Sequence, residues 1–135
     1  MAGETTGSPG TRPPIGLPVG AFIVPFKQAS YGSSDNQLPD VKQIGYLPSD
    51  VTVLGFGYLP SDMDTNVSPT LVHKIAVGGT DVVTGLTGAQ TGAASFVPCA
   101  PFKVTGGQKL VTVVSSTAAA TAATGTLDLW ALVQK

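Results

Sequence analysis

Apolar and polar residues alternate along the chain between residues 126 and 134. Aliphatic side chains fall on one side of an extended backbone, at Leu127, Leu129, Ala131 and Val133. The other side carries mostly polar residues and a tryptophan, at Thr126, Asp128, Trp130 and Gln134. A period of two is the pattern of a β-strand with one buried face. We therefore predict a strand here whose aliphatic side lies in the core.

Similar short runs elsewhere are separated by turn signals such as Gly78–Gly79 and Gly106–Gly107. We predict strands at residues 41–47, 51–59, 70–77, 94–97, 102–104, 109–115 and 126–134. An eighth strand at 21–26 would lie at a sheet edge, because Pro25 lacks an N–H. The fold class is therefore all-β, an antiparallel β-sandwich or jelly roll of seven to eight strands. The pattern leaves both topologies open.

Two details of the strand pattern lead to further expectations. Residues 109–115 and 126–134 are interpreted as a closing hairpin, with the Thr/Ala-rich loop 116–125 as an exposed tip. The sequence GYLPSD occurs twice, at residues 45–50 and 57–62. We expect both copies to end a strand with the same turn chemistry, in which Pro fixes φ and Ser and Asp cap the turn.

The chain is divided into an N-terminal arm, residues 1–39, and a body, residues 40–135. The beginning of the arm is rich in Gly, Pro, Thr and Ser and cannot bury enough surface to order alone. Apolar anchors follow at Ile15, Leu17, Val19 and Phe22. The first dozen residues are interpreted as a disordered terminus. From Ile15 onward we expect docking, either on the chain's own body or on a neighbouring subunit.

Composition excludes several functional classes. Charged residues make up 11% of the 135 residues and the net charge is −1, which disfavours nucleic acid as a partner. The longest apolar run, residues 19–26, is far too short to cross a membrane, and the N-terminus does not resemble a secretory signal. Cys99 is the only cysteine, so no intramolecular disulfide forms, as expected for assembly in a reducing cytoplasm.

Candidate metal ligands are sparse. Asp62, Asp64 and Asn66 form a D-x-D-x-N pattern, which resembles the start of an EF-hand loop. The sixth and twelfth positions are Val67 and His73 rather than Gly and an acidic residue, so an EF-hand is excluded. A polar turn is the preferred interpretation, and an irregular calcium site is the weaker alternative. We expect no cofactor.

Candidate catalytic residues are also few. His73, the only histidine, shares a strand face with aliphatic residues and is interpreted as a packed, hydrogen-bonded residue or a contact at the sheet rim. A dyad of His73 with Cys99 has no positive support. The chain contains no G-x-S-x-G, phosphate-loop or H-E-x-x-H motif. We therefore expect that the protein is not an enzyme.

Trp130 lies opposite the aliphatic side of its strand. One interpretation is that a loop or the N-terminal arm covers it. The other is that Trp130 anchors an interface, since tryptophan is enriched at energetically important contacts.

Two segments resemble a known protein family. The first runs from Leu59 to Leu71 (LPSDMDTNVSPTL) and leads into VHKIAV, and the second is VTVVSSTAAATAATGTLDLWALV. Together, over residues 47–135, they are similar to small head proteins of tailed bacteriophages. The resemblance implies a β-sandwich or jelly-roll decoration (cement) protein on the capsid exterior, often a homotrimer.

These implications define the expected function: a structural virion protein, made in the host cytoplasm, that binds the major capsid protein and stabilises the shell. The arm would contact neighbouring subunits. One alternative is a carbohydrate- or receptor-binding module of a fibre or tail, with stacking surfaces at Tyr31, Tyr46, Tyr58 and Trp130. Another is a minor structural protein of the head or tail.

Overall fold

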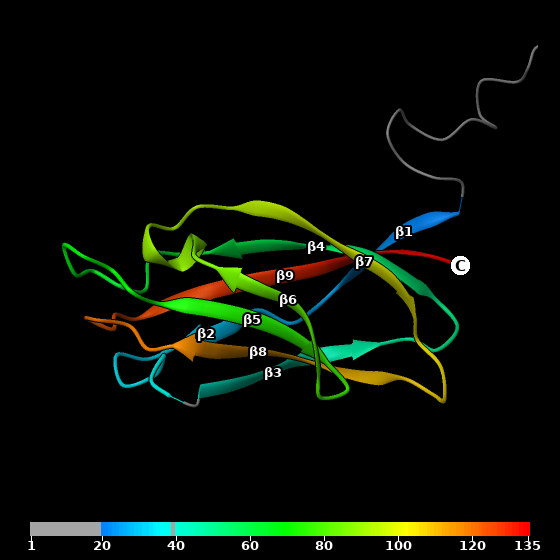
Figure 1. Ribbon diagram of the computed structural model, residues 1–135, viewed down its shortest axis with the longest axis horizontal. Helices are drawn as coiled ribbons and strands as arrows, with labels where there is room; N and C mark the ends of the chain where they lie inside the picture. The colour runs from blue at the N-terminus through cyan, green and yellow to red at the C-terminus, as the bar shows by residue number, and fades with distance from the viewer. Residues whose placement is uncertain (1–19, 39) are drawn as a thin grey trace, which may run out of the picture.

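Two antiparallel sheets pack face to face in the structure, a computed structural model that describes residues 20–38 and 40–135 (Figure 1). The first, the β9 sheet, has the order β1 (Ala21–Pro25), β9 (Gly125–Gln134), β4 (Thr52–Pro60), β7 (Ser95–Lys103), and β2 (Ala29–Tyr31) also pairs with β9. The second, the β8 sheet, has the order β3 (Asp40–Leu47), β8 (Lys109–Thr117), β5 (Val72–Val77), β6 (Thr80–Leu86). The predicted antiparallel β-sandwich is confirmed.

The core lies between the sheets. The predicted aliphatic stripe of β9 is buried, and its residues Leu127, Leu129, Ala131 and Val133 belong to the central apolar cluster. The inward side of the opposite sheet supplies Ile75, Val111 and Val113 to the same cluster. Burial of one face of each sheet is the main stabilising contribution in such a fold.

The predicted closing hairpin is wrong. β8 pairs with β3 and β5, whereas β9 pairs with β1, β2 and β4, so the two strands lie in different sheets. The loop between them crosses from one sheet to the other and is tied down on the way. Ala119 is buried, and its N–H donates to the carbonyl of Asn36 at 2.9 Å. The loop is therefore not a free tip, as its composition had suggested.

The predicted strands differ from the observed ones in two ways: two strands are absent from the prediction, and two predicted strands form a single one. β2 and β6 were not predicted, and the single strand β7 spans the two segments that Pro98 and Pro101 seemed to separate. Because β7 is the last strand of its sheet, its prolines need no partner on the outer side. The turn at Gly78–Gly79 is a two-residue hairpin between β5 and β6 with φ of 58° and 85°, values that favour glycine.

The two GYLPSD copies end strands, as expected, but their Tyr and Leu side chains point to opposite sides of their sheets in the two copies. In the first copy Tyr46 is 54% exposed and Leu47 is buried, whereas in the second Tyr58 is buried and Leu59 is exposed. The expectation that both copies share the same turn chemistry is wrong. In the second copy the Asp62 carboxylate accepts from the Asp64 N–H and the Ser61 hydroxyl accepts from the Thr126 N–H, whereas in the first copy Asp50 has a φ of 67° and its N–H donates to the Val104 carbonyl.

Residues assigned to the arm fall into two parts. Ile15, Leu17 and Val19 lie outside the described residues. β1 and β2 pair with β9 within the β9 sheet, so residues 21–25 and 29–31 are strands of the sandwich. No helix in the described part of the chain is long and apolar enough to span a membrane.

Candidate functional site

The outer face of the β9 sheet carries an apolar surface that crosses four strands. Strand register brings Pro25, Trp130, Gly57 and Phe96 into one row. The next row contains Ile23, Leu132, Gly55 and Pro98. We call this surface, together with Leu59, the Trp130 face. Ile23, Phe96 and Leu59 are between 40% and 49% exposed, so the surface is open to a partner.

The neighbours of Trp130 on the adjacent strands hold its side chain in one position. Its indole ring stacks on Phe96, with centroids 5.6 Å apart and an interplanar angle of 25°. The ring also occupies the space that a side chain on Gly57 would need, because a Cβ placed there would overlap the indole. Glycine at this position lets Trp130 lie flat across the neighbouring strand, half-buried. Such a pre-ordered aromatic group costs little conformational entropy on binding.

Polar groups border the two apolar rows. On one side lies the row Ala21, Gln134, Thr52 and Lys103, and on the other Asp128 accepts hydrogen bonds from Gln28 at 3.2 Å. An uncharged centre with a polar border is the usual anatomy of a protein–protein contact. Phe96 is the only close ring partner of Trp130 among the described residues, and the role of Trp130 as an interface anchor stays a prediction.

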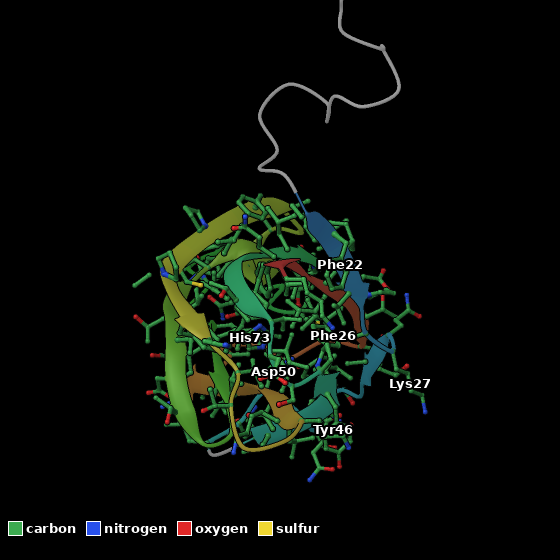
Figure 2. The ribbon with its side chains drawn as sticks, turned by 90° about the vertical axis from the view of Figure 1, so that its right-hand side faces the viewer. Phe22, Phe26, Lys27, Tyr46, Asp50 and His73 are labelled. Atoms are coloured by element: carbon green, nitrogen blue, oxygen red, sulfur yellow. The ribbon has the colours of Figure 1, made fainter. Side chains whose placement is uncertain are left out.

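Phe22, the other described residue predicted for an interface, has a different environment. It pairs with Val133, whose side chain points into the core, so Phe22 faces inward at the open side of the sandwich. Its side chain is nevertheless 40% exposed (Figure 2).

The three candidate calcium ligands serve separate local hydrogen bonds. Asp64 is buried, and its carboxylate accepts from the backbone N–H groups of Thr70, Leu71, Ala120 and Thr121 at 2.8 to 3.1 Å. The Asp62 carboxylate accepts from the Asp64 N–H at 3.2 Å. The Asn66 amide donates to the Thr121 hydroxyl and accepts from the Ser68 N–H.

Asp64 thus fastens the loop after β4 to the loop between β8 and β9. Burial acts to raise the pKa of the Asp64 carboxyl, but the four N–H donors outweigh it and lower the pKa to about 2. A cation approaching this carboxylate would face the same donors. Among the described residues, no group of three or more His, Cys, Asp and Glu is placed to hold a metal ion.

A second buried polar cluster surrounds His73. The Tyr58 hydroxyl lies 2.6 Å from Nδ1 of His73, and Nε2 lies 2.8 Å from Oδ1 of Asn36, which also accepts from Ser115. Since an amide oxygen only accepts, Nε2 carries the proton and Nδ1 accepts from Tyr58. The interpretation of His73 as a packed, hydrogen-bonded residue is confirmed (Figure 2).

The surroundings of His73 keep its ring neutral. Burial lowers the pKa of His73 from 6.5 to about 4, against the weaker attraction of Asp40. Tyr31 stacks on the imidazole with centroids 5.7 Å apart, and the Lys42 ammonium lies over the Tyr31 ring, 5.0 Å from its centroid. Both ring nitrogens of His73 are engaged, so it has no free nitrogen to act as a base for Cys99, whose own thiol pKa is raised by burial.

Sequence reasoning missed Asn36, the residue that joins this cluster. It is buried and has a φ of 62°, a conformation that asparagine tolerates better than most residues. The surrounding sequence SSDNQ contains no pattern that indicates an amide reaching the core.

Solved structures similar to this chain come from phage capsids. A chain from the cyanophage Pam1 capsid asymmetric unit is 26% identical, with a TM-score of 0.71, and the match covers 96% of each chain. A chain from the capsid of Ralstonia phage GP4 is 14% identical, with a TM-score of 0.66, covering 82% of this chain and 84% of that chain. The predicted resemblance to a phage head protein is confirmed. The second match shows the fold alone. No family model matches the sequence, and the comparison with curated proteins gives no match.

Proposed function

We propose that this chain is a decoration protein that binds the exterior of a tailed-phage capsid and stabilises the shell. A structural role in the virion is supported by the match to the Pam1 capsid chain, and the GP4 capsid chain shares the fold. The protein acts by binding and not by catalysis.

One observation carries the proposal: the Pam1 capsid chain is matched over 96% of its own length and 96% of this chain. The similarity therefore joins two whole chains of nearly equal size, and not one domain of a large capsid subunit. A sandwich of this size falls well short of the usual major capsid fold. A small separate chain in a capsid fits an added component of the shell.

The strand order supports the jelly-roll form of the sandwich. Apart from the β5–β6 hairpin, successive main strands pass from one sheet to the other, and the orders β1-β9-β4-β7 and β3-β8-β5-β6 are those of a jelly roll of eight main strands. This arrangement gives a stiff body with two outer sheet faces, one of which is the Trp130 face. We assign that face to contact with a neighbouring copy, in a homotrimer.

A sugar- or receptor-binding module receives no support from the aromatic residues. Tyr31 and Tyr58 are buried. Tyr46 and Trp130 remain, but they lie on different sheets. They do not form one stacking surface.

Purified protein added to shells that lack it should decorate them at regular lattice positions, as seen by cryo-electron microscopy. Deleting residues 1–20 should reduce the apparent affinity roughly tenfold or more, because an arm that contacts a neighbour adds to affinity through effective concentration. β1 begins at Ala21, so the deletion leaves every described strand in place. Bare shells with the full chain would refute the decoration role, and equal occupancy by the deletion variant would refute the role of the arm.

Trp130→Ala should dissociate the oligomer, with a loss of about 2 kcal/mol or more per contact, as for a central aromatic anchor. Light scattering at several protein concentrations measures this change. Tyr46→Ala is the matched control, since it removes an exposed aromatic ring from the other sheet. An unchanged assembly state in the Trp130 variant would contradict this assignment.

A further inference from the structure

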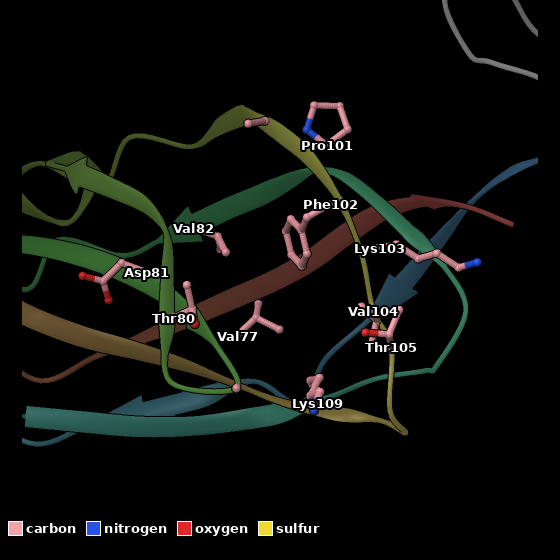
Figure 3. Close-up of a pocket in the computed structure, with 12 residues that line it drawn as sticks. Val77, Thr80, Asp81, Val82, Pro101, Phe102, Lys103, Val104, Thr105 and Lys109 are labelled. Atoms are coloured by element: carbon pink, nitrogen blue, oxygen red, sulfur yellow. The ribbon is translucent and has the colours of Figure 1, made fainter.

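A groove of about 540 Å³ opens on the side of the sandwich where β6 and β7 face each other (Figure 3). Its apolar lining includes Val77, Val82, Pro101, Phe102 and Val104. Val77 and Val104 are buried at its floor, whereas Val82 and Phe102 are partly exposed. Thr80, Lys103, Thr105 and Lys109 also line it, so the groove is a recess between two strands with an apolar floor and polar groups around it.

Both strands beside the groove are the outermost of their sheets. Among the described strands, β6 pairs only with β5, and β7 pairs only with β4. Pro98 and Pro101 remove two N–H donors from β7, but β6 contains no proline. An extended segment entering the groove can thus lie along the edge of β6 while its side chains reach the apolar floor.

The chain itself contains a segment with the matching pattern. Ile15, Leu17 and Val19 alternate with small residues and proline, so an extended backbone would place all three on one side. Residues 13–20 carry no charge. The charged residues that line the groove are Asp81, Lys103 and Lys109. Asp81 is paired with Lys74 at 3.0 Å, and Lys103 is exposed to solvent, so an uncharged segment in the groove meets no unpaired carboxylate.

We propose that the groove between β6 and β7 receives residues 15–19 of a neighbouring copy of this chain. This inference deepens the proposed function and rests on its subunit contacts, because it names the surface that accepts the arm.

Distance favours a neighbouring copy over the chain's own arm. Ala21 and Lys103, which lines the groove, lie at the two ends of one row and are three strand spacings apart, or about 14 Å. Leu17 precedes Ala21 by four residues and can extend at most about 14 Å from it. Val19 can extend only about half as far. The chain's own arm therefore cannot place all three anchors in its own groove.

Disulfide trapping tests the contact in the full-length protein with Cys99→Ser as background. One isotope-labelled preparation carries Pro18→Cys, beside the anchors, and an unlabelled one carries Thr105→Cys, at the exposed mouth of the groove. After mixing and mild oxidation, mass spectrometry should find the mixed disulfide between the two. Ser68→Cys, on an exposed loop that does not line the groove, replaces Thr105→Cys in the control.

Adding Leu17→Asp to the Pro18→Cys chain should lower the yield roughly tenfold, since it replaces an apolar anchor of the groove by a charge. The variant lies in the arm and leaves the core of the body unchanged. The inference is overturned if the Thr105 pair forms no more disulfide than the Ser68 pair, or if Leu17→Asp has no effect. It is also overturned if a chain that carries both Pro18→Cys and Thr105→Cys forms only an intramolecular disulfide. If the protein decorates shells but the Thr105 pair forms no disulfide, the inference about the groove is refuted and the decoration role stands. If the disulfide forms but the protein leaves shells bare, the decoration role is refuted and the inference about the groove stands.

Discussion

Acidification from pH 7 to pH 4 is expected to lower the free energy of unfolding by about 3 kcal/mol, because the folded core holds His73 neutral. The pKa of His73 is about 4 in the folded protein, against the ordinary histidine value of 6.5 in the unfolded chain. The unfolded chain therefore binds a proton at a pH where the folded chain does not. The stabilisation is complete above pH 6.5 and is lost as the pH falls toward 4.

The hydrogen bonds around the ring explain why protonation is resisted. Nδ1 accepts from Tyr58, whose oxygen also accepts from the Ala89 N–H. A proton on Nδ1 would face this oxygen, and the Tyr58 hydrogen would need a new acceptor. The charge of Asp40 acts to raise the pKa of His73, but its effect is smaller than that of burial.

Denaturant unfolding at pH 7, 5.5 and 4 measures the effect, and His73→Gln is the control. Glutamine can keep the bond to Asn36 but does not titrate, so this variant should be less stable at pH 7 and nearly independent of pH in this range. The pKa of Asp64 is lowered from 3.8 to about 2, so its stabilisation is present above pH 3.8 and is lost as the pH falls toward 2. A wild-type protein with constant stability from pH 7 to 4 would show that His73 does not have this role.

Asp64→Ala is expected to destabilise the protein by about 4 kcal/mol, because it leaves four buried or partly buried N–H groups of two loops without an acceptor. Bonds to a charged acceptor contribute more than neutral ones, and unpaired buried donors add a desolvation cost. Asp64→Asn keeps one acceptor oxygen and should lose about half as much.

Thermal and denaturant unfolding measure both Asp64 variants beside Asp62→Ala. Asp62 is the neighbouring acidic residue and accepts one bond at 3.2 Å, so its replacement should cost less than about 1 kcal/mol. Equal losses for Asp62→Ala and Asp64→Ala would mean that the general charge of the segment matters and not the fastening of the two loops.

The sequence predicted the fold class well because sheet burial follows a period of two. The stripe from Leu127 to Val133 and the double glycine at Gly78–Gly79 are local signals, and both are present in the structure. The prediction missed β6, which contains Gly85 with a φ of 71°, because glycine is more typical of turns than of strands. β7 was divided because prolines at the edge of a sheet look like prolines in a loop.

Candidate sites were harder to predict, because their partners are distant in the chain. The D-x-D-x-N pattern suggested metal ligands, but the donors to Asp64 include backbone groups of Ala120 and Thr121, which carry no sequence signal. Trp130 was selected correctly as a residue on the outer face. Its row with Gly57 and Phe96 depends on register between three strands, which the alternation in one strand does not specify.

The central position of β8 and β9 has a consequence for the order of synthesis. Each is an inner strand of its sheet, and together they pair with β1, β2, β3, β4 and β5, all of which leave the ribosome earlier. Until the last part of the chain is translated, those strands lack their main partner. The nascent protein therefore cannot close its sandwich stepwise, and assembly-competent subunits appear only after translation has passed β9.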